Sequence, residues 1–155
     1  MEYKHILIGT DGSELMETVY EHCAYLARLT NATVHIVYVL DIAGFASVPI
    51  DSVPIVSRWE NMYDVLLDEG KAIAENAKKA VISYGVNKEA VKTAVLEGHP
   101  SSELNTYAEN NAVDLIVIGT HGRKGLDRLL IGSVADKVIR EAKVPVLVVR
   151  SPTDI

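Results

Sequence analysis

The stretch from Asp114 to Gly119 reads DLIVIG, and every position between its two ends is apolar. A second run of the same kind, VLVV, occupies positions 146–149. A strand with one wet face alternates apolar and polar residues, whereas a strand buried on both faces of a parallel sheet is apolar almost throughout. These two runs therefore predict a parallel sheet that is covered on both faces.

Strands and helical segments alternate on either side of these runs. The predicted strands are Lys4–Gly9, Thr33–Val39, Ala90–Leu96, Asp114–Gly119 and Pro145–Val149. The spacing of apolar residues predicts the helices Glu14–Thr30, Arg58–Tyr84, Ser101–Asn111 and Ser133–Ala142. Alternation of this kind is typical of a doubly wound α/β domain with right-handed crossovers.

Length and composition narrow the class of protein. The 155 residues fit one domain spanning 1–155, and a content of 48% hydrophobic and 23% charged residues is ordinary for a globular chain. The net charge of −6 argues against a general nucleic-acid binder, and the lone Cys23 cannot form an intrachain disulfide. Because we find neither a signal peptide nor an apolar run of about 20 residues, we expect a cytoplasmic protein without membrane partners.

The connection 41–57 is longer than a turn and contains two prolines. Long irregular connections inside compact domains are often functional. Three interpretations stay open for it: a lid over a ligand, a dimer contact and a plain surface loop.

The turn after the fourth predicted strand, from Gly119 to Ser133, is the richest candidate for a binding site. In an open parallel sheet, ligands bind at the carboxyl ends of the strands, near the point where strand order reverses. Glycines at 119 and 122 let the backbone turn sharply and approach a ligand closely. Cationic side chains lie within the same turn, at Arg123, Lys124 and Arg128.

This turn leads directly into the last predicted helix. Ser133 is a good N-cap residue, and Asp136 three positions later resembles the partner of a capping box. The start of a helix offers unpaired N–H groups and a partial positive charge, which favour an anion such as phosphate. Neither the Walker spacing nor the dinucleotide-binding spacing occurs here. The alternative is a glycine-rich turn with an ordinary cap and no ligand.

Other reactive residue types give weaker signals. His5, His22 and His35 fall on predicted strands or a helix without a spaced partner, and no spacing typical of a metal site is present. His99 precedes Pro100, and we interpret it as structural. Cys23 lies on an apolar stripe, which predicts a core position. No nucleophile motif is present either, so we predict no catalytic residue.

The pattern Gly119-x-x-Gly122, nine residues, then Gly132-Ser133 resembles the ATP-binding signature of the universal stress protein family. The resemblance extends over essentially the whole chain. It includes Ile8-Gly9-Thr10-Asp11-Gly12-Ser13, Val39-Leu40-Asp41, Gly98-x-Pro100, the run from Asp114 to Gly119 and the terminal run from Val144 to Val149. The full signature is similar to that of the ATP-binding branch of the family.

This resemblance implies a Rossmann-type sheet of five parallel strands in the order 3-2-1-4-5, as in adenine nucleotide alpha hydrolases. It implies that Asp11 meets the ribose or adenine side, although a helix cap is the alternative role for this residue. It implies that the Val39 backbone reads the adenine edge. From their residue types and positions, Thr10 adds a contact or only shapes the turn, and His121 bonds the ligand or is merely solvated. The predicted nucleotide-binding set is Thr10, Asp11, Val39, Gly119, His121, Gly122, Arg123, Gly132, Ser133 and Val134.

The expected function is that of an ATP-binding switch or sensor with slow ATP hydrolysis at most, and Mg²⁺ or Mn²⁺ would arrive with the phosphates. An enzyme of nucleotide α-phosphate chemistry and a module for another phosphorylated metabolite are the alternatives. The resemblance also implies a homodimer. An apolar last strand at a sheet edge invites pairing with its own copy, unless the tail 151–155 shields it.

Overall fold

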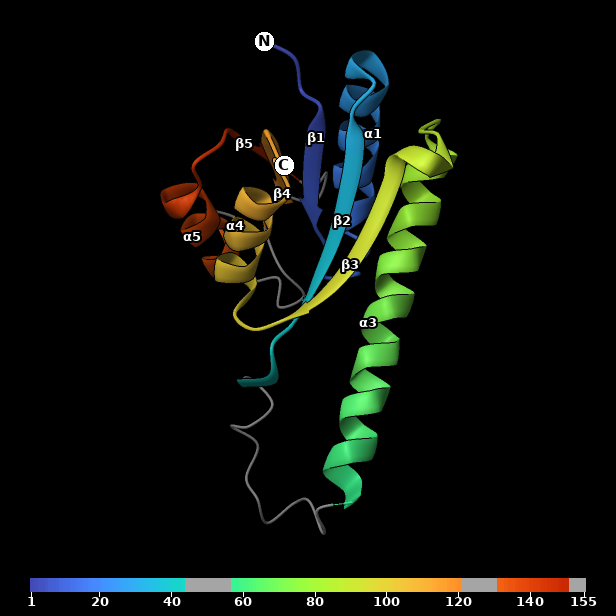
Figure 1. The fold of residues 1–155 in the computed structure, drawn as a ribbon, viewed down its shortest axis with the longest axis vertical. Helices are drawn as coiled ribbons and strands as arrows, with labels where there is room; N and C mark the ends of the chain where they lie inside the picture. The colour runs from blue at the N-terminus through green and yellow to red at the C-terminus, as the bar shows by residue number, and fades with distance from the viewer. Residues whose placement is uncertain (44–56, 121–130, 151–155) are drawn as a thin grey trace.

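The computed structural model describes residues 1–43, 57–120 and 131–150 (Figure 1). Within them, five strands form one parallel sheet in the order β3-β2-β1-β4-β5, which confirms the predicted topology. The strands are β1 His5–Gly9, β2 Thr33–Leu40, β3 Val91–Glu97, β4 Leu115–Gly119 and β5 Val146–Val149. The helices are α1 Met16–Thr30, α3 Ser57–Ser83, α4 Pro100–Asn110 and α5 Ser133–Glu141, with a short 3-10 turn η2 at Lys88–Ala90.

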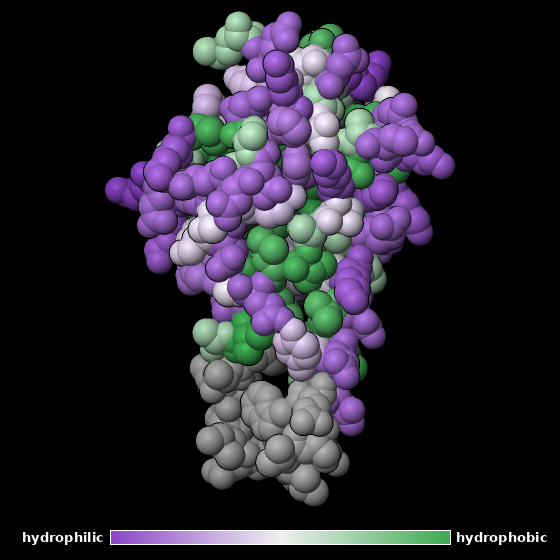
Figure 2. Space-filling model, viewed as in Figure 1, coloured by the Kyte–Doolittle hydropathy of each residue, from purple (hydrophilic) through white to green (hydrophobic). Residues whose placement is uncertain are grey.

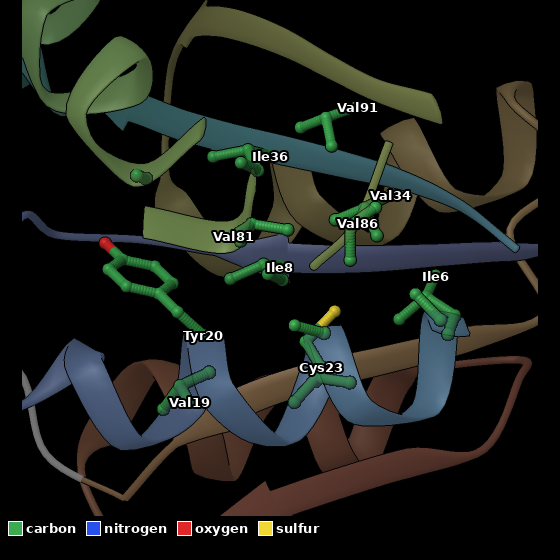
Figure 3. Packing of buried hydrophobic residues seen from close by; sticks show 14 of the residues in the cluster. Ile6, Ile8, Val19, Tyr20, Cys23, Val34, Ile36, Val81, Val86 and Val91 are labelled. Carbon is green, nitrogen blue, oxygen red and sulfur yellow. The ribbon is translucent and has the colours of Figure 1, made fainter. Parts of the chain in front are cut away.

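The central strands β1 and β4 are buried on both faces, as the run DLIVIG predicts, whereas the run VLVV forms β5, a half-buried strand at the sheet edge. Ile6, Leu7 and Ile8 of β1 are each fully buried. Ile6 and Ile8 pack in a core with α1 and α3, whereas Leu7 packs in a second core with α4 and α5. Figure 3 shows Val19, Tyr20 and Cys23 of α1 beneath the sheet in the first core. The sheet is therefore a middle layer between two pairs of helices.

The strand β3 is the less covered edge of the sheet, and most of its residues are at least partly exposed. Figure 2 shows hydrophobic surface between α4 and α3 on a face that is otherwise mostly hydrophilic. In Figure 1, α3 runs well past the carboxyl ends of the strands. No helix in the described ranges is long and apolar enough to cross a membrane.

The strands β1 and β4 each begin one residue later than predicted, and Asp114 ties their starts together. Its carboxylate accepts hydrogen bonds from the backbone N–H of Lys4 (2.8 Å) and of His5 (3.3 Å), and its own N–H donates to the His5 carbonyl (2.9 Å). One side-chain group and one backbone bond thus join the start of β4 to the start of β1. The helix α1 also begins later than predicted, at Met16, after a tighter turn in which the Met16 N–H bonds the Ser13 carbonyl.

His5 and His35, which no metal-site spacing links in the sequence, are in contact in the structure. The register of β1 and β2 places them on one face, with His5 Nδ1 3.0 Å from His35 Nε2. Nδ1 of His35 lies 2.9 Å from the Tyr107 hydroxyl on α4. His35 is buried, and this desolvation, followed by the charges of His5 and Lys92, lowers its pKa from 6.5 to about 4.

The sheet parts at the carboxyl end of β1. Pairing of β1 with β4 ends at Ile8–Val117, and its pairing with β2 ends at Gly9–Val37. The outer pairs continue further, β2 with β3 to Leu40–Glu97 and β4 with β5 to Gly119–Val149. Strand order also reverses here, because the chain builds β2 and β3 on one side of β1 and then β4 and β5 on the other. Ligands bind at this point in sheets of this kind.

Candidate functional site

The first component of the site is the turn after β1, which Thr10 orders from within. The Thr10 N–H donates to the Val37 carbonyl (3.0 Å), and its Oγ1 accepts from the Gly12 N–H (3.1 Å). The same hydroxyl lies 2.5 Å from the hydroxyl of Tyr20 on α1. Thr10 and Tyr20 are both buried. The amide and hydroxyl of Thr10 are thus engaged inside the protein, where they order the turn, and its predicted contact with a ligand stays a prediction.

Asp11 stands at the tip of this turn and is half-buried. Its Oδ1 accepts a hydrogen bond from the Ser13 N–H (2.9 Å), which closes a local turn of the kind that aspartate favours. The N-cap of α1 is Leu15, with no side-chain capping bond, so the alternative role of Asp11 as the cap of that helix is wrong. Gly12 follows with a φ of +75°, and a Cβ there would lie 2.9 Å from Cγ2 of Ile73 on α3.

The second component is the backbone of Val39 near the end of β2. The Val37 carbonyl faces β1, where it accepts from Thr10, whereas the Leu40 carbonyl faces β3, where it accepts from the Gly98 N–H (3.0 Å). The backbone N–H and C=O groups of successive residues in a strand point toward opposite neighbouring strands. The N–H and C=O of Val39 therefore point to the same side as those of Val37, toward β1. Among the described residues, the ladder between β1 and β2 ends before that point. The Val39 side chain packs against the second core.

The third component is the junction of β4 with α5. The Gly132 N–H donates to the Thr120 carbonyl (2.7 Å), which brings the start of the helix against the end of the strand. The first-turn N–H groups of Ser133, Val134 and Ala135 have no acceptor within α5, because helical bonding begins with the Asp136 N–H to the Gly132 carbonyl (2.9 Å). Ala135 was not in the predicted set.

The predicted capping arrangement at this junction is wrong. Gly132 is the N-cap, in an extended conformation with φ −58° and ψ 156°, and Ser133 is the first helical residue. Asp136 is therefore one position too far along to reach back to the cap. Its carboxylate instead pairs with Arg140 one turn later, at 3.0 Å.

The glycine at the end of β4 lies close to α1. A Cβ added to Gly119 would meet Cγ2 of Val19 at 3.4 Å and Sδ of Met16 at 3.9 Å, both ordinary contacts. His121, Gly122 and Arg123 from the predicted set lie outside the described residues, as does most of the 41–57 connection. Their predicted roles stay predictions.

The described part of the set thus converges from three strands on the carboxyl end of β1. It supplies one carboxylate, a strand backbone beyond its ladder and the donors of a helix start. Sequence reasoning missed Ser13, whose buried Oγ has no hydrogen-bond partner in the described part of the chain, and it missed Tyr20. Groups of three or more His, Cys, Asp or Glu that could hold a metal are absent from residues 1–43, 57–120 and 131–150. His99 bonds Ser101 Oγ at 2.9 Å, in keeping with a structural role.

Comparison with known proteins places this geometry in a family. Residues 2–150 match the model of the universal stress protein family. The chain is 39% identical to the universal stress protein MJ0531 of Methanocaldococcus jannaschii over 150 residues, covering 97% of this chain and 84% of that protein. The solved structure of MJ0577, from the same archaeon, superposes with a TM-score of 0.80 at 34% identity, covering 97% of both chains.

Two more distant structures share the fold and were solved with nucleotides. One is a universal stress protein in complex with cAMP, with a TM-score of 0.68 at 22% identity, covering 97% of this chain and 99% of that chain. The other is the Archaeoglobus fulgidus universal stress protein in complex with dAMP, with a TM-score of 0.67 at 23% identity, covering 96% of this chain and 98% of that chain.

Proposed function

Because this chain belongs to the universal stress protein family, we propose that it binds ATP, or a close adenine nucleotide, and acts as a nucleotide-dependent switch or sensor. The observation that carries the proposal is the convergence of the Asp11 turn, the Val39 backbone and the start of α5 where strand order reverses. The cAMP and dAMP complexes of two structural neighbours support the adenine nucleotide class.

In the proposed complex, Val39 recognises the base through its main chain. The Watson–Crick edge of adenine offers a donor at N6 beside an acceptor at N1, which matches a strand C=O and N–H that lie beyond the β1 ladder. Guanine reverses this pattern at the same edge. We therefore assign base selection to the backbone, so the identity of the Val39 side chain contributes by packing only.

The phosphates lie at the start of α5 in this proposal. The Gly132 N–H is taken by the Thr120 carbonyl, so the donors are the N–H groups of Ser133, Val134 and Ala135. Gly132 contributes by its lack of a side chain, since a ligand can approach its backbone closely. His121, Gly122 and Arg123 complete the phosphate side, and Mg²⁺ or Mn²⁺ arrives bound to the phosphates.

The ribose lies beside Asp11. A carboxylate accepts hydrogen bonds and repels phosphate, so it suits sugar hydroxyls at the opposite end of the site from α5. We assign no catalytic residue, and we expect ATP hydrolysis to be slow or to need a partner. We further propose one cytoplasmic domain that pairs through β5, whose residues Val146–Val148 are half-buried at the sheet edge.

The decisive experiment is to denature the purified protein and identify the nucleotide that it releases, then to titrate the emptied and refolded protein with Mg-ATP by calorimetry. One adenine nucleotide per chain supports the proposal, and the absence of both co-purified and titrated nucleotide refutes it. Rapid conversion of ATP to AMP and pyrophosphate would favour the enzyme alternative. Preference for another phosphorylated metabolite would favour the binding-module alternative. Sedimentation velocity tests the dimer, since a purely monomeric species contradicts it.

A variant at Gly132 tests the location of the site. Gly132→Val adds a branched side chain at the proposed phosphate position, while the extended φ and ψ of Gly132 are ones that valine adopts without strain. We expect ATP binding to be lost with the circular dichroism spectrum unchanged. Lys137→Val is the matched control, because it adds the same side chain at an exposed position of the same helix. If the Gly132 variant binds ATP with the same affinity as the wild type, the phosphate site is not at the start of α5.

A further inference from the structure

Tyr20 is an unusual member of the first core because it carries a hydroxyl into it. Its side chain is 6% exposed and packs among the apolar residues of α1 and the sheet (Figure 3). A buried phenol needs a hydrogen-bond partner, and Tyr20 finds it in Thr10 Oγ1 at 2.5 Å. The contact joins the body of α1 to the turn that presents Asp11.

The Thr10 hydroxyl connects this core contact to the turn. The oxygen that bonds Tyr20 also accepts from the Gly12 N–H (3.1 Å), so it holds the residue that follows Asp11. On the other side of Asp11, the Thr10 N–H is bonded to the β2 backbone at Val37 (3.0 Å). Both neighbours of Asp11 are therefore anchored, one to the sheet and one through Thr10 to α1.

Asp11 itself is oriented inside this frame. Its Oδ1 accepts from the Ser13 N–H at 2.9 Å, and Gly12 can turn the chain only because its φ of +75° suits glycine. The Asp11 charge is close enough to act on the phenol. The pKa of Tyr20 is raised mainly by burial, with further increases from Asp11 and Glu17 that oppose the lowering by the Thr10 hydrogen bond. The phenol therefore stays protonated and keeps its hydrogen bond.

We propose that Tyr20, acting through the Thr10 hydroxyl, is a positioning residue that sets the selectivity of the site for ribose hydroxyls by fixing Asp11. This inference rests on the proposed nucleotide site. Tyr20 touches no ligand, so its effect reaches the nucleotide only through the geometry of the turn. A hydrogen bond to a charged acceptor depends steeply on placement, and its loss lowers affinity about tenfold or more. Loosening the turn should therefore weaken binding of ATP more than binding of analogues that lack a hydroxyl.

The test compares ATP, 2′-dATP and 3′-dATP by calorimetry on the full-length protein. Tyr20→Phe removes only the phenol oxygen, and Thr10→Val removes the hydroxyl at nearly constant volume. Asp11→Asn is the reference that removes the proposed acceptor charge. We expect the ratio of ATP affinity to deoxynucleotide affinity to fall in all three variants, by at least about threefold for Tyr20→Phe. Thr10→Ser should recover most of the ratio that Thr10→Val loses.

Tyr84→Phe is the matched control, because it deletes a phenol oxygen that bonds Glu17 of α1 and not Thr10. It should leave the ratio unchanged. The inference is overturned if the ratio of ATP affinity to deoxynucleotide affinity is unchanged in Tyr20→Phe and Thr10→Val. This holds even if both variants bind all three nucleotides equally more weakly. The proposed function survives that outcome. If the wild type binds none of the nucleotides, the proposed function fails first and the inference fails with it. Thermal unfolding of each variant separates loss of fold from loss of selectivity.

Discussion

Acidification should destabilise this protein through His35. His35 lies on β2 with 3% of its surface exposed, between His5 of β1 and Tyr107 of α4. Lys92 is its register partner on β3. Burial first, and then the charges of His5 and Lys92, lower the pKa of His35 to about 4. Protonation of His35 would place a positive charge in a buried position without water, next to the basic side chains of His5 and Lys92.

The sign and the size of the effect follow from proton linkage. Between pH 6.5 and 4 the unfolded chain binds a proton at this position and the folded protein does not, so stability falls as pH decreases across that window. At 1.36 kcal/mol for each unit, the loss is about 2 kcal/mol at pH 5 and levels off near 3 kcal/mol below pH 4. Above pH 6.5 both states are neutral at His35 and the effect vanishes.

Urea unfolding at pH 7.5 and pH 5.0 measures this contribution. Between pH 7.5 and pH 5.0, the free energy of unfolding should decrease less in His35→Gln than in the wild type, because glutamine does not titrate. The expected difference between the two decreases is about 2 kcal/mol. His22→Gln is the control, since His22 is an exposed histidine on α1 and should follow the wild type. If His35→Gln loses as much stability as the wild type between the two pH values, the linkage argument is refuted.

Three further predictions concern stability and reactivity. Cys23 is fully buried and burial raises its pKa to about 12, so an aromatic disulfide reagent at pH 8 should leave the native thiol unmodified and label it fully in denaturant. Gly12→Ala should lower the free energy of unfolding by about 1–3 kcal/mol, because the φ of Gly12 is positive and Ile73 lies 2.9 Å from the new methyl group. Gly119→Ala makes contacts no closer than 3.4 Å and should lower it by less than about 1 kcal/mol. Equal losses for the two variants in urea unfolding would contradict the packing described. Asp114→Ala leaves the N–H groups of Lys4 and His5 without their acceptor, so we expect a loss of about 1–3 kcal/mol by urea unfolding, with faster hydrogen exchange confined to the start of β1.

The parts of the fold that the sequence predicted are those that depend on local burial. The run DLIVIG predicts a doubly covered strand because burial on both faces dictates the residue types one by one. The strand order came from the resemblance to a family, since pairing depends on contacts far apart in the chain. The apolar stripe of α1 correctly placed Cys23 in the core, but the buried face also includes Met16 and Tyr20. Periodicity gave the helix and the centre of its buried face, but not the full width of that face.

The prediction of the candidate site rests on local residue types in the same way. Glycines and a helix start mark an anion site locally, but the cap at Gly132 depends on its bond to Thr120, which no spacing rule contains. The pairing of His5 with His35 likewise follows from the register of two strands. The contact between Tyr20 and Thr10 needs the crossing of α1 over β1 to be known. Each of these depends on three-dimensional placement.

The hydrogen bonds from the start of β1 to Asp114 have a consequence for folding during translation. They join residues 110 positions apart, because Lys4 is bonded to Asp114. During synthesis at roughly 5–20 residues per second, β1 waits about 5 to 20 s for β4 to emerge. In that interval β1 can pair with β2 on one side only, and its other edge is a template for a strand of any nascent neighbour. Truncation before Asp114 would make that exposure permanent, so we expect such fragments to aggregate during translation.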